Sequence, residues 1–270
     1  MKLDGTRVLL TGAAGGIGAA IAKELTSQGA KLLLTGRRAE PLAALQLELQ
    51  GTSCTVESVT ADLTDPSARA FLAEIARKWQ GGIDVLIHNA GDSDFVLLAD
   101  QPEIRIAQLI ELNVLAPILL TRALLPLLET RPEACVLNVG SILGHIGHPG
   151  FAVYGASKAA LAAFSEALRR ECADSSVRVL YVAPRATRTP LNSAAVVALN
   201  EALGAASDAP ERVAQAVVRA LRRNRKRTLI GWPEKLFVRI NALLPGIVDR
   251  SFRAKLGVVR ELAASEHESV

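Results

Sequence analysis

Short apolar runs alternate with longer amphipathic segments along almost the whole chain. The short runs are rich in Val, Leu and Ile and lack strict alternation with polar residues, which is typical of strands buried on both faces of a sheet. This pattern predicts strands over Val8–Thr11, Lys31–Thr35, Cys54–Thr60, Val85–His88, Cys135–Gly140, Val177–Ala183 and Thr228–Gly231. Helical periodicity predicts helices over Ile17–Gln28, Pro41–Gln50, Pro66–Trp79, Ile104–Glu129, Tyr154–Cys172 and Glu211–Arg223.

Because predicted strands and helices alternate, the chain is expected to form right-handed crossovers and a parallel sheet. We therefore predict an α/β fold, a doubly wound parallel sheet of about seven strands with helices on both faces. The chain has 270 residues, and 50% of them are apolar, which is enough for one large core. Residues 1–232 are predicted to form this domain, and residues 233–270 form a C-terminal extension.

The C-terminal extension has the pattern of an apolar helical face with basic positions between its members. Three interpretations remain open, in decreasing order of preference. The face packs against the same subunit or a partner copy, it covers the mouth of a substrate site, or it docks shallowly on an anionic membrane. Residues 263–270 are expected to be disordered. The apolar positions are Phe237, Ile240, Leu243, Leu244, Ile247, Val248 and Phe252.

The charge excess of the chain is small and is concentrated in one run. The formal net charge is +4, and much of it lies in Arg219–Arg227. No aromatic residue interleaves this run, which favours a solvated helix end over a nucleic-acid site. Cys54, Cys135 and Cys172 form no CxxC pair, so neither a disulfide framework nor a zinc site is predicted, and a reducing compartment is expected.

Neither a targeting segment nor a metal site is predicted. The first apolar stretch, Val8–Leu10, is too short for a signal peptide, and no segment is expected to approach membrane-spanning length. We therefore expect a cytoplasmic protein. His145 and His148 lie close together in the sequence, but no third metal ligand accompanies them, so we interpret them as pocket lining or loop polarity.

A glycine-rich segment directly follows the first predicted strand and precedes a helix. Glycine permits the positive φ of a tight turn and lets a diphosphate approach the backbone. The N-terminus of the following helix offers free N–H groups and a partial positive charge to that anion. In this setting the segment predicts nucleotide binding rather than an ordinary turn. The contacts are assigned to Gly12, Gly16, Ile17 and Gly18.

The spacing TGxxxGxG, from Thr11 to Gly18, resembles that of the short-chain dehydrogenase/reductase family, in its single-domain branch. The resemblance covers roughly residues 5–190 through several ordered motifs. It implies a Rossmann-type domain that binds a nicotinamide dinucleotide and transfers a hydride. It also implies a homo-oligomer, because the long helices around Asn113 and Tyr154 resemble the family's usual subunit contacts.

Two further motifs extend the cofactor site that this resemblance implies. One resembles the family's adenine-contacting pair, although its Asp also suits a plain turn. The other matches the family's NAG motif, which lies against the cofactor and steadies the sheet. The residues are Asp62 and Leu63 for the first motif, and Asn89, Ala90 and Gly91 for the second.

The family pattern Pro-Gly-x-x-x-Thr is matched by Pro184 and Thr189 after the sixth predicted strand. By resemblance, Thr189 contacts the nicotinamide carboxamide. Arg185 stands where the family usually has Gly, which puts in doubt the backbone geometry that Gly permits there. Two interpretations of this arginine remain open: it meets an acidic substrate, or it turns outward to solvent.

The residues after the second predicted strand bear on the choice of cofactor. A site for NAD usually places a carboxylate here on the ribose 2′-hydroxyl. No Asp or Glu stands between the end of the second predicted strand and Glu40, and Glu40 itself falls in the next helix. Arg37 suits a 2′-phosphate instead, because guanidinium binds phosphate bidentately. We predict NADP(H) over NAD(H), with Arg37 preferred over Arg38; the alternative is that both arginines cap a surface loop.

Tyr154 and Lys158 lie four residues apart, which puts them one turn apart on one helix face. The ammonium and the oxidised nicotinamide are expected to lower the pKa of the phenol, which then exchanges a proton with the substrate oxygen. Ser141 is predicted to orient that oxygen rather than to act as a triad nucleophile. Asn113 is unfavourable inside a helix, and the family resemblance assigns it to a proton relay from the active-site lysine.

We therefore predict an NADP(H)-dependent oxidoreductase that acts on a ketone or a 3-oxoacyl-type carbonyl, or on the matching alcohol. The apolar segment 191–207 falls where the family carries a substrate lid, which favours a small hydrophobic substrate. An NAD-dependent alcohol or steroid-type dehydrogenase and a non-catalytic nucleotide sensor are the alternatives. A nucleotide-sugar epimerase is disfavoured by the glycine spacing and by the lack of a sizeable C-terminal domain.

Overall fold

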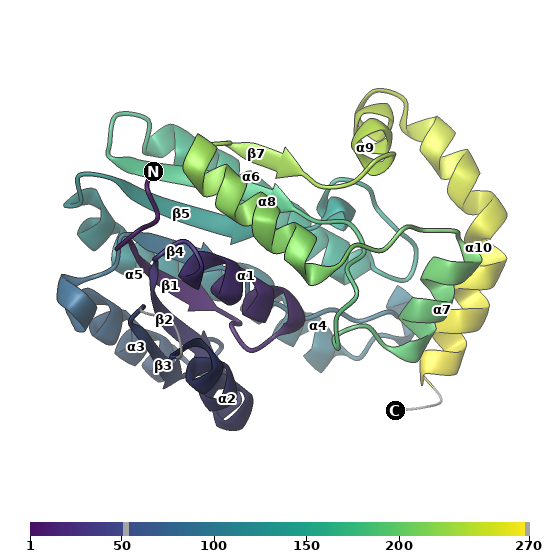
Figure 1. Cartoon of the computed structure of the whole chain (residues 1–270). Coiled ribbons are helices and arrows are strands. Elements are labelled where there is room, and N and C mark those ends of the chain that lie inside the picture. Colours follow the sequence, from purple (N-terminus) through teal and green to yellow (C-terminus); the bar gives the residue numbers. More distant parts are fainter. Residues whose placement is uncertain (51–53, 268–270) are drawn as a thin grey trace.

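A computed structural model describes residues 1–50 and 54–267 and contains a seven-stranded sheet in the order β3-β2-β1-β4-β5-β6-β7 (Figure 1). Every neighbouring pair of strands is parallel, so the predicted doubly wound α/β fold is confirmed. The strands are β1 (Arg7–Thr11), β2 (Lys31–Gly36), β3 (Val56–Thr60), β4 (Val85–His88), β5 (Ala134–Val139), β6 (Val177–Ala183) and β7 (Arg227–Leu229).

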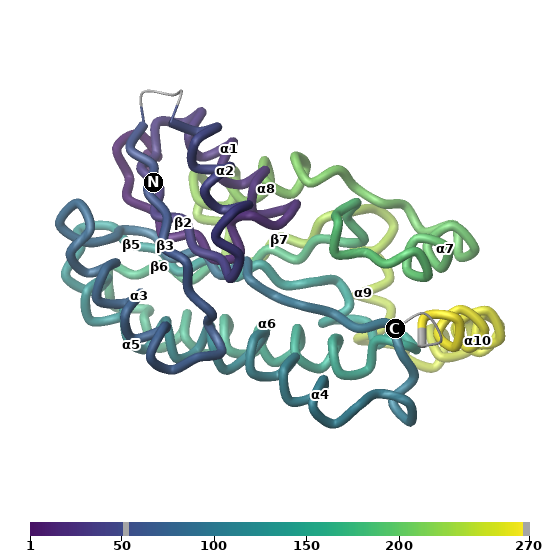
Figure 2. The backbone as a smooth tube through the Cα atoms, turned by 90° about the horizontal axis from the view of Figure 1, so that it is seen from below, coloured from purple at the N-terminus to yellow at the C-terminus, as the bar shows by residue number. Residues whose placement is uncertain are grey.

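Helices cover both faces of the sheet: α1, α2 and α8 lie on one face, and α3, α5 and α6 lie on the other (Figure 2). In Figure 1, α7, α9 and α10 lie beyond the end of the sheet to which the strand arrows point. The helices are α1 (Gly16–Thr26), α2 (Ala39–Gln50), α3 (Pro66–Lys78), α4 (Glu103–Ile110), α5 (Ala116–Glu129), α6 (Ala152–Glu171), α7 (Ala194–Ala202), α8 (Pro210–Arg223), α9 (Glu234–Leu243) and α10 (Pro245–His267).

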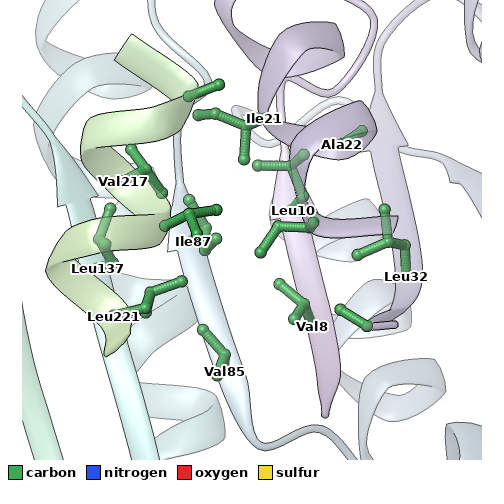
Figure 3. Close-up of a cluster of buried hydrophobic side chains, with 14 of the residues drawn as sticks. Val8, Leu10, Ile21, Ala22, Leu32, Val85, Ile87, Leu137, Val217 and Leu221 are labelled. Carbon is green, nitrogen blue, oxygen red and sulfur yellow. The ribbon is translucent and has the colours of Figure 1, made fainter. Parts of the chain in front are cut away.

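The two helical layers explain why the strands read as unbroken apolar runs. Val8 and Leu10 of β1 point into the core under α1 and α8, as Figure 3 shows. Leu9, between them, belongs to the core on the opposite face. All three side chains are fully buried, because successive residues of a strand face opposite sides and both sides are covered.

The predicted helix Ile104–Glu129 is present but is not uniform. A π-helical turn, η3 (Glu111–Leu115), separates α4 from α5, so the chain is wound more loosely around Asn113. The continuous helix Glu103–Glu129 is long and apolar enough to cross a membrane by length and composition alone, so the expectation that no segment approaches this length is wrong. In this fold its Leu120 and Leu124 are buried in the core beneath the sheet.

The C-terminal extension is helical, and α10 packs along α7 of the same chain. Val259 and Ala263 of α10 are buried against Leu199 of α7. The expectation of disorder is therefore wrong for residues 263–267, because this contact holds the end of α10; residues 268–270 lie outside the described part of the chain.

The apolar positions of the extension do not share one face. The chain turns between α9 and α10, at Leu244, so the two helices present different sides to the domain. Phe252 packs inward, together with Val238 and Val248. A second set points to solvent, with Phe237, Leu243, Leu244 and Ile247 all exposed.

Candidate active site

The glycine loop between β1 and α1 leaves no space for a side chain at Gly12 or at Gly16. Gly12 has φ +62°, and a Cβ there would stand 2.7 Å from the Cα of Ala90. A Cβ on Gly16 would stand 2.9 Å from the Cγ2 of Thr189. Helix α1 begins at Gly16 without any side-chain cap, so its first N–H groups are free to bind an anion. The loop therefore fits a dinucleotide diphosphate.

We expect Gly18→Ala to weaken NADPH binding by about tenfold or more, because the added methyl group would overlap the carbonyl oxygen of Gly12 and displace the loop. Gly15→Ala is the matched control, since a Cβ there meets nothing closer than 3.4 Å. Titration of NADPH fluorescence measures both affinities. Equal affinities in the two variants would contradict this account of the loop.

Asn89, Ala90 and Gly91 tie the loop to the end of β4. The backbone N–H groups of Asn89 and Ala90 each donate to Thr11 Oγ1 at 3.0 Å, and Asn89 Nδ2 donates to the carbonyl of Gly12 at 3.0 Å. On the catalytic side, a Cβ on Gly91 would meet the side chains of Asn113 and Lys158. These three residues thus join the cofactor loop to the catalytic residues.

The adenine end of the predicted site lies beyond β2 and β3. Arg37 and Arg38 are both exposed after β2, and neither forms an ion pair within residues 1–50 and 54–267. Asp62 Oδ1 accepts bonds from the N–H and the hydroxyl of Thr64 at 2.9 and 2.8 Å, so Asp62 does serve in a turn. Leu63 is buried.

Ser141, Tyr154 and Lys158 come together on the walls of one cavity. The side chain of Ser141, which follows β5, interacts with the phenol of Tyr154 and favours its ionised form. Lys158 is buried one helical turn from Tyr154, with Nζ 5.8 Å from the phenol ring centroid. Its ammonium donates to the carbonyl of Val139 at 3.4 Å. The cavity therefore offers a hydroxyl pair and a cation to one substrate oxygen.

Asn113 is buried at the centre of the π-helical turn and supports this group from behind. Its Nδ2 donates to the hydroxyl of Ser157 at 3.0 Å, and that hydroxyl donates to the carbonyl of Tyr154 at 2.7 Å. Asn113 also exchanges two bonds of 2.9 Å with the backbone of Asp92. It fixes the start of α6, and the proton relay that the resemblance implies stays a prediction.

Burial sets the charge states of the catalytic pair. It raises the pKa of the Tyr154 hydroxyl above its ordinary value, and the interaction with Ser141 opposes this shift. Burial lowers the pKa of Lys158 to about 8. The predicted lowering of the phenol pKa included the charge of the oxidised nicotinamide and stays a prediction; among the protein groups alone, burial outweighs the other contributions. A protonated phenol is the form that donates to a developing alkoxide.

We expect kcat/KM for carbonyl reduction to fall as the pH rises through about 8, because Lys158 loses its proton there. Because the pKa of Lys158 is lowered to about 8, its amine is fully protonated only well below that pH. The raised pKa of Tyr154 keeps the phenol protonated as the pH passes through 8. The decrease is measured from the rate of NADPH oxidation as a function of pH. A profile that stays flat to pH 9.5 would show that the charge on Lys158 is not required.

The catalytic cavity measures about 330 Å³ and is mostly apolar away from the catalytic group. Loop η4 (Ile142–Gly144) and the lid segment 191–207 form its walls. Pro184 and Thr189 line it beside the glycine loop, and the contact of Thr189 with the nicotinamide carboxamide stays a prediction. The apolar lining consists of Ile142, Leu143, Ile146, Phe151, Leu191, Val196, Leu199, Leu203 and Phe252.

Sequence reasoning missed two contributions to this cavity. Phe252 and Glu234 come from the C-terminal extension, and only the apolar pattern that includes Phe252 pointed toward a cover for the substrate mouth. His148 lines the same cavity, with its ring against Phe151 and Phe252. His145 lies outside it and packs on Tyr181, so the two histidines have different surroundings.

Arg185 does not turn to solvent: it lies in the wall of the catalytic cavity and is paired with two carboxylates. Its guanidinium donates to Asp208 Oδ1 at 2.8 Å and to Glu234 Oε2 at 3.2 Å, with only 10% of the side chain exposed. Arg212 also pairs with Asp208, at 2.9 Å. The interpretation that Arg185 turns to solvent is therefore wrong, whereas contact with an acidic substrate stays a prediction. Arg185 forms ion pairs with two carboxylates and joins the end of the lid to the start of the extension.

A parallel sheet with an uncapped glycine loop and a Ser–Tyr–Lys group in one cavity defines an NAD(P)-dependent oxidoreductase. The sequence profile described as short chain dehydrogenase matches residues 6–199. The chain belongs to the short-chain dehydrogenase/reductase family. Among the residues described, no group of three or more His, Cys, Asp or Glu side chains is placed to hold a metal ion.

Three known proteins illustrate the family membership. Dehydrogenase/reductase SDR family member 7B of Bos taurus is 33% identical, over 96% of this chain and 83% of that protein. Ketoacyl reductase HetN of Nostoc sp. is 30% identical, over 93% of this chain and 89% of its own length. A short chain dehydrogenase from Burkholderia cenocepacia, solved in complex with NADP, is 27% identical with a TM-score of 0.79, over 87% of this chain and 100% of that chain.

Proposed function

We propose that this protein is an NADP(H)-dependent reductase of ketones, including 3-oxoacyl-type carbonyls. The observation that carries the proposal is the position of the Tyr154 hydroxyl with Ser141 and Lys158 in one largely apolar cavity beside the glycine loop. Apolar walls favour a substrate that carries a hydrocarbon chain or ring. The name of the similar ketoacyl reductase agrees with an acyl substrate.

Each residue has a distinct role in this reaction. The nicotinamide supplies the hydride when it is bound. Ser141 donates a hydrogen bond to the carbonyl oxygen and holds it in place. Tyr154 gives its proton to the same oxygen as charge develops there. Lys158, buried beside the ring, stabilises the phenolate that remains.

The choice of NADP(H) rests on the exposed Arg37, which has no carboxylate partner in residues 1–50 and 54–267. A free guanidinium at the end of β2 suits a 2′-phosphate. The similar Burkholderia protein, whose structure holds NADP, agrees with this choice.

We expect the wild-type protein to reduce 3-oxoacyl thioesters with a lower KM for NADPH than for NADH. Arg37→Ala should raise the KM for NADPH by about tenfold or more, because it removes a charged hydrogen bond, and should leave the KM for NADH unchanged. Arg38→Ala is the matched control. Oxidation of NADPH and NADH at 340 nm, over a panel of ketones and oxoacyl thioesters, measures these values. A wild-type protein that binds NADPH but reduces no member of the panel would contradict the proposed function.

A further inference from the structure

An exposed apolar surface, which we call the apolar tip, lies on α9 and on the residues that directly precede and follow this helix. Helix α9 stands at the edge of the molecule, away from α2 and α3 (Figure 1). Leu243 is 79% exposed, although it belongs to a helix whose other face is anchored to the domain. The apolar tip consists of Trp232, Leu236, Phe237, Leu243, Leu244 and Ile247, all exposed.

Helix α9 is fixed to the domain by its opposite face, so the side chains of the apolar tip are held toward solvent. Val238 is buried against Ile142 and Ile146. Asn241 Nδ2 donates to the carbonyl of His145 at 3.0 Å. Glu234, at the start of α9, pairs with the buried Arg185. These three anchors hold the apolar side chains outward.

Basic side chains surround the apolar tip. Lys235 and Arg239 lie one turn apart on α9, beside residues of the apolar tip. Arg250 is three residues beyond Ile247 on α10. None of them forms an ion pair within residues 1–50 and 54–267. Between residues 233 and 256 the chain has five basic and two acidic residues, and one acidic residue, Glu234, is paired with Arg185.

We propose that the apolar tip docks on an anionic lipid bilayer. Apolar side chains flanked by free cations are the pattern of a helix that lies in the interface of such a bilayer. A second copy of the chain fits less well, because a two-fold contact through this surface brings the same basic residues together. The same extension also reaches the catalytic cavity, where Glu234 and Phe252 form part of the wall.

Docking at this surface would bring an apolar substrate to the cavity from the bilayer. This consequence deepens the proposed function and rests on it, whereas docking itself does not require turnover. Binding to vesicles is therefore measured without cofactor or substrate, and its failure is distinct from a failure of the reductase assay.

The test is co-sedimentation of the purified chain with phosphatidylcholine vesicles, with and without phosphatidylglycerol. We expect binding only to the anionic vesicles, and weaker binding at high salt, because salt screens the basic side chains. Leu243→Asp should weaken binding by about tenfold or more. Leu47→Asp is the matched control, because Leu47 of α2 is 73% exposed and lies far from α9. Lys235→Gln should weaken binding about fivefold.

Trp232 gives an independent signal. The chain has two tryptophans; Trp232 is 65% exposed at the apolar tip and Trp79 is buried. A blue shift of the emission on addition of anionic vesicles therefore reports Trp232 leaving water. Absence of binding by the wild type, or equal loss in Leu47→Asp and Leu243→Asp, would overturn the proposal. The proposal would also be overturned if the wild-type protein did not bind vesicles and Leu243→Asp dissociated an oligomer in gel filtration.

Discussion

Replacing Tyr154 with Phe is expected to lower kcat for carbonyl reduction by about 10²- to 10⁴-fold, because it removes the proton donor and little else. The phenol shares the cavity with Ser141, and its ring packs beside Phe151 in the cavity wall. Phe keeps that ring and its packing. The affinity for NADPH and the urea midpoint should therefore stay close to those of wild type.

Single-turnover reduction and NADPH titration on the same preparation separate these effects. Phe151→Leu is a suitable comparison, since it alters the aromatic wall beside Tyr154 without touching the hydroxyl. It should change KM more than kcat. If Tyr154→Phe retained wild-type kcat, the acid–base role of the phenol would be wrong.

Replacing Arg185 with Met is expected to cost about 3 kcal/mol of the free energy of unfolding. Met keeps the aliphatic stem but leaves Glu234 without its cation and removes one of the two cations of Asp208. The carboxylate of Asp208 is 3% exposed, so water cannot replace the lost partner. The end of the lid and the start of α9 lose their common anchor, and the KM for the carbonyl substrate should rise.

Arg212→Ala is the control for this prediction. Arg212 pairs with the same Asp208 oxygen, but its side chain is 55% exposed, so its loss should cost at most about 1 kcal/mol. Urea unfolding of the two variants measures the difference. Equal costs would mean that the buried arginine contributes no more than a surface ion pair.

The two variants also bear on what a sequence can reveal. Arg185 departs from a family pattern, and the interpretation that it turns to solvent was wrong. Its partners Asp208 and Glu234 lie 23 and 49 residues further along the chain. Nothing in the local pattern marks them, because only the fold brings the end of the lid and the start of α9 to the same point.

The local sequence pattern was sufficient to identify site residues that belong to one short segment of the chain. Gly12 and Gly18 were predicted from spacing. The tight contacts at Gly18 lie within one strand–loop–helix unit, whereas those at Gly12 are with Ala90, which the fold brings there from the end of β4. Tyr154 and Lys158 share a helix face because of their four-residue spacing. The part of burial in the pKa of Tyr154 could not be predicted in this way, since burial depends on how distant segments pack around the cavity.

The sequence by itself determined the order of strands and helices, the parallel sheet and the residues of the glycine loop, because each depends on periodicity or spacing within a few tens of residues. The tertiary structure alone decided the pairing of Arg185, the entry of Phe252 into the cavity and the exposure of the apolar tip. These features join segments that are distant in the chain. Their positions depend on how α7, α9 and α10 pack beyond the sheet, and no local propensity encodes that packing.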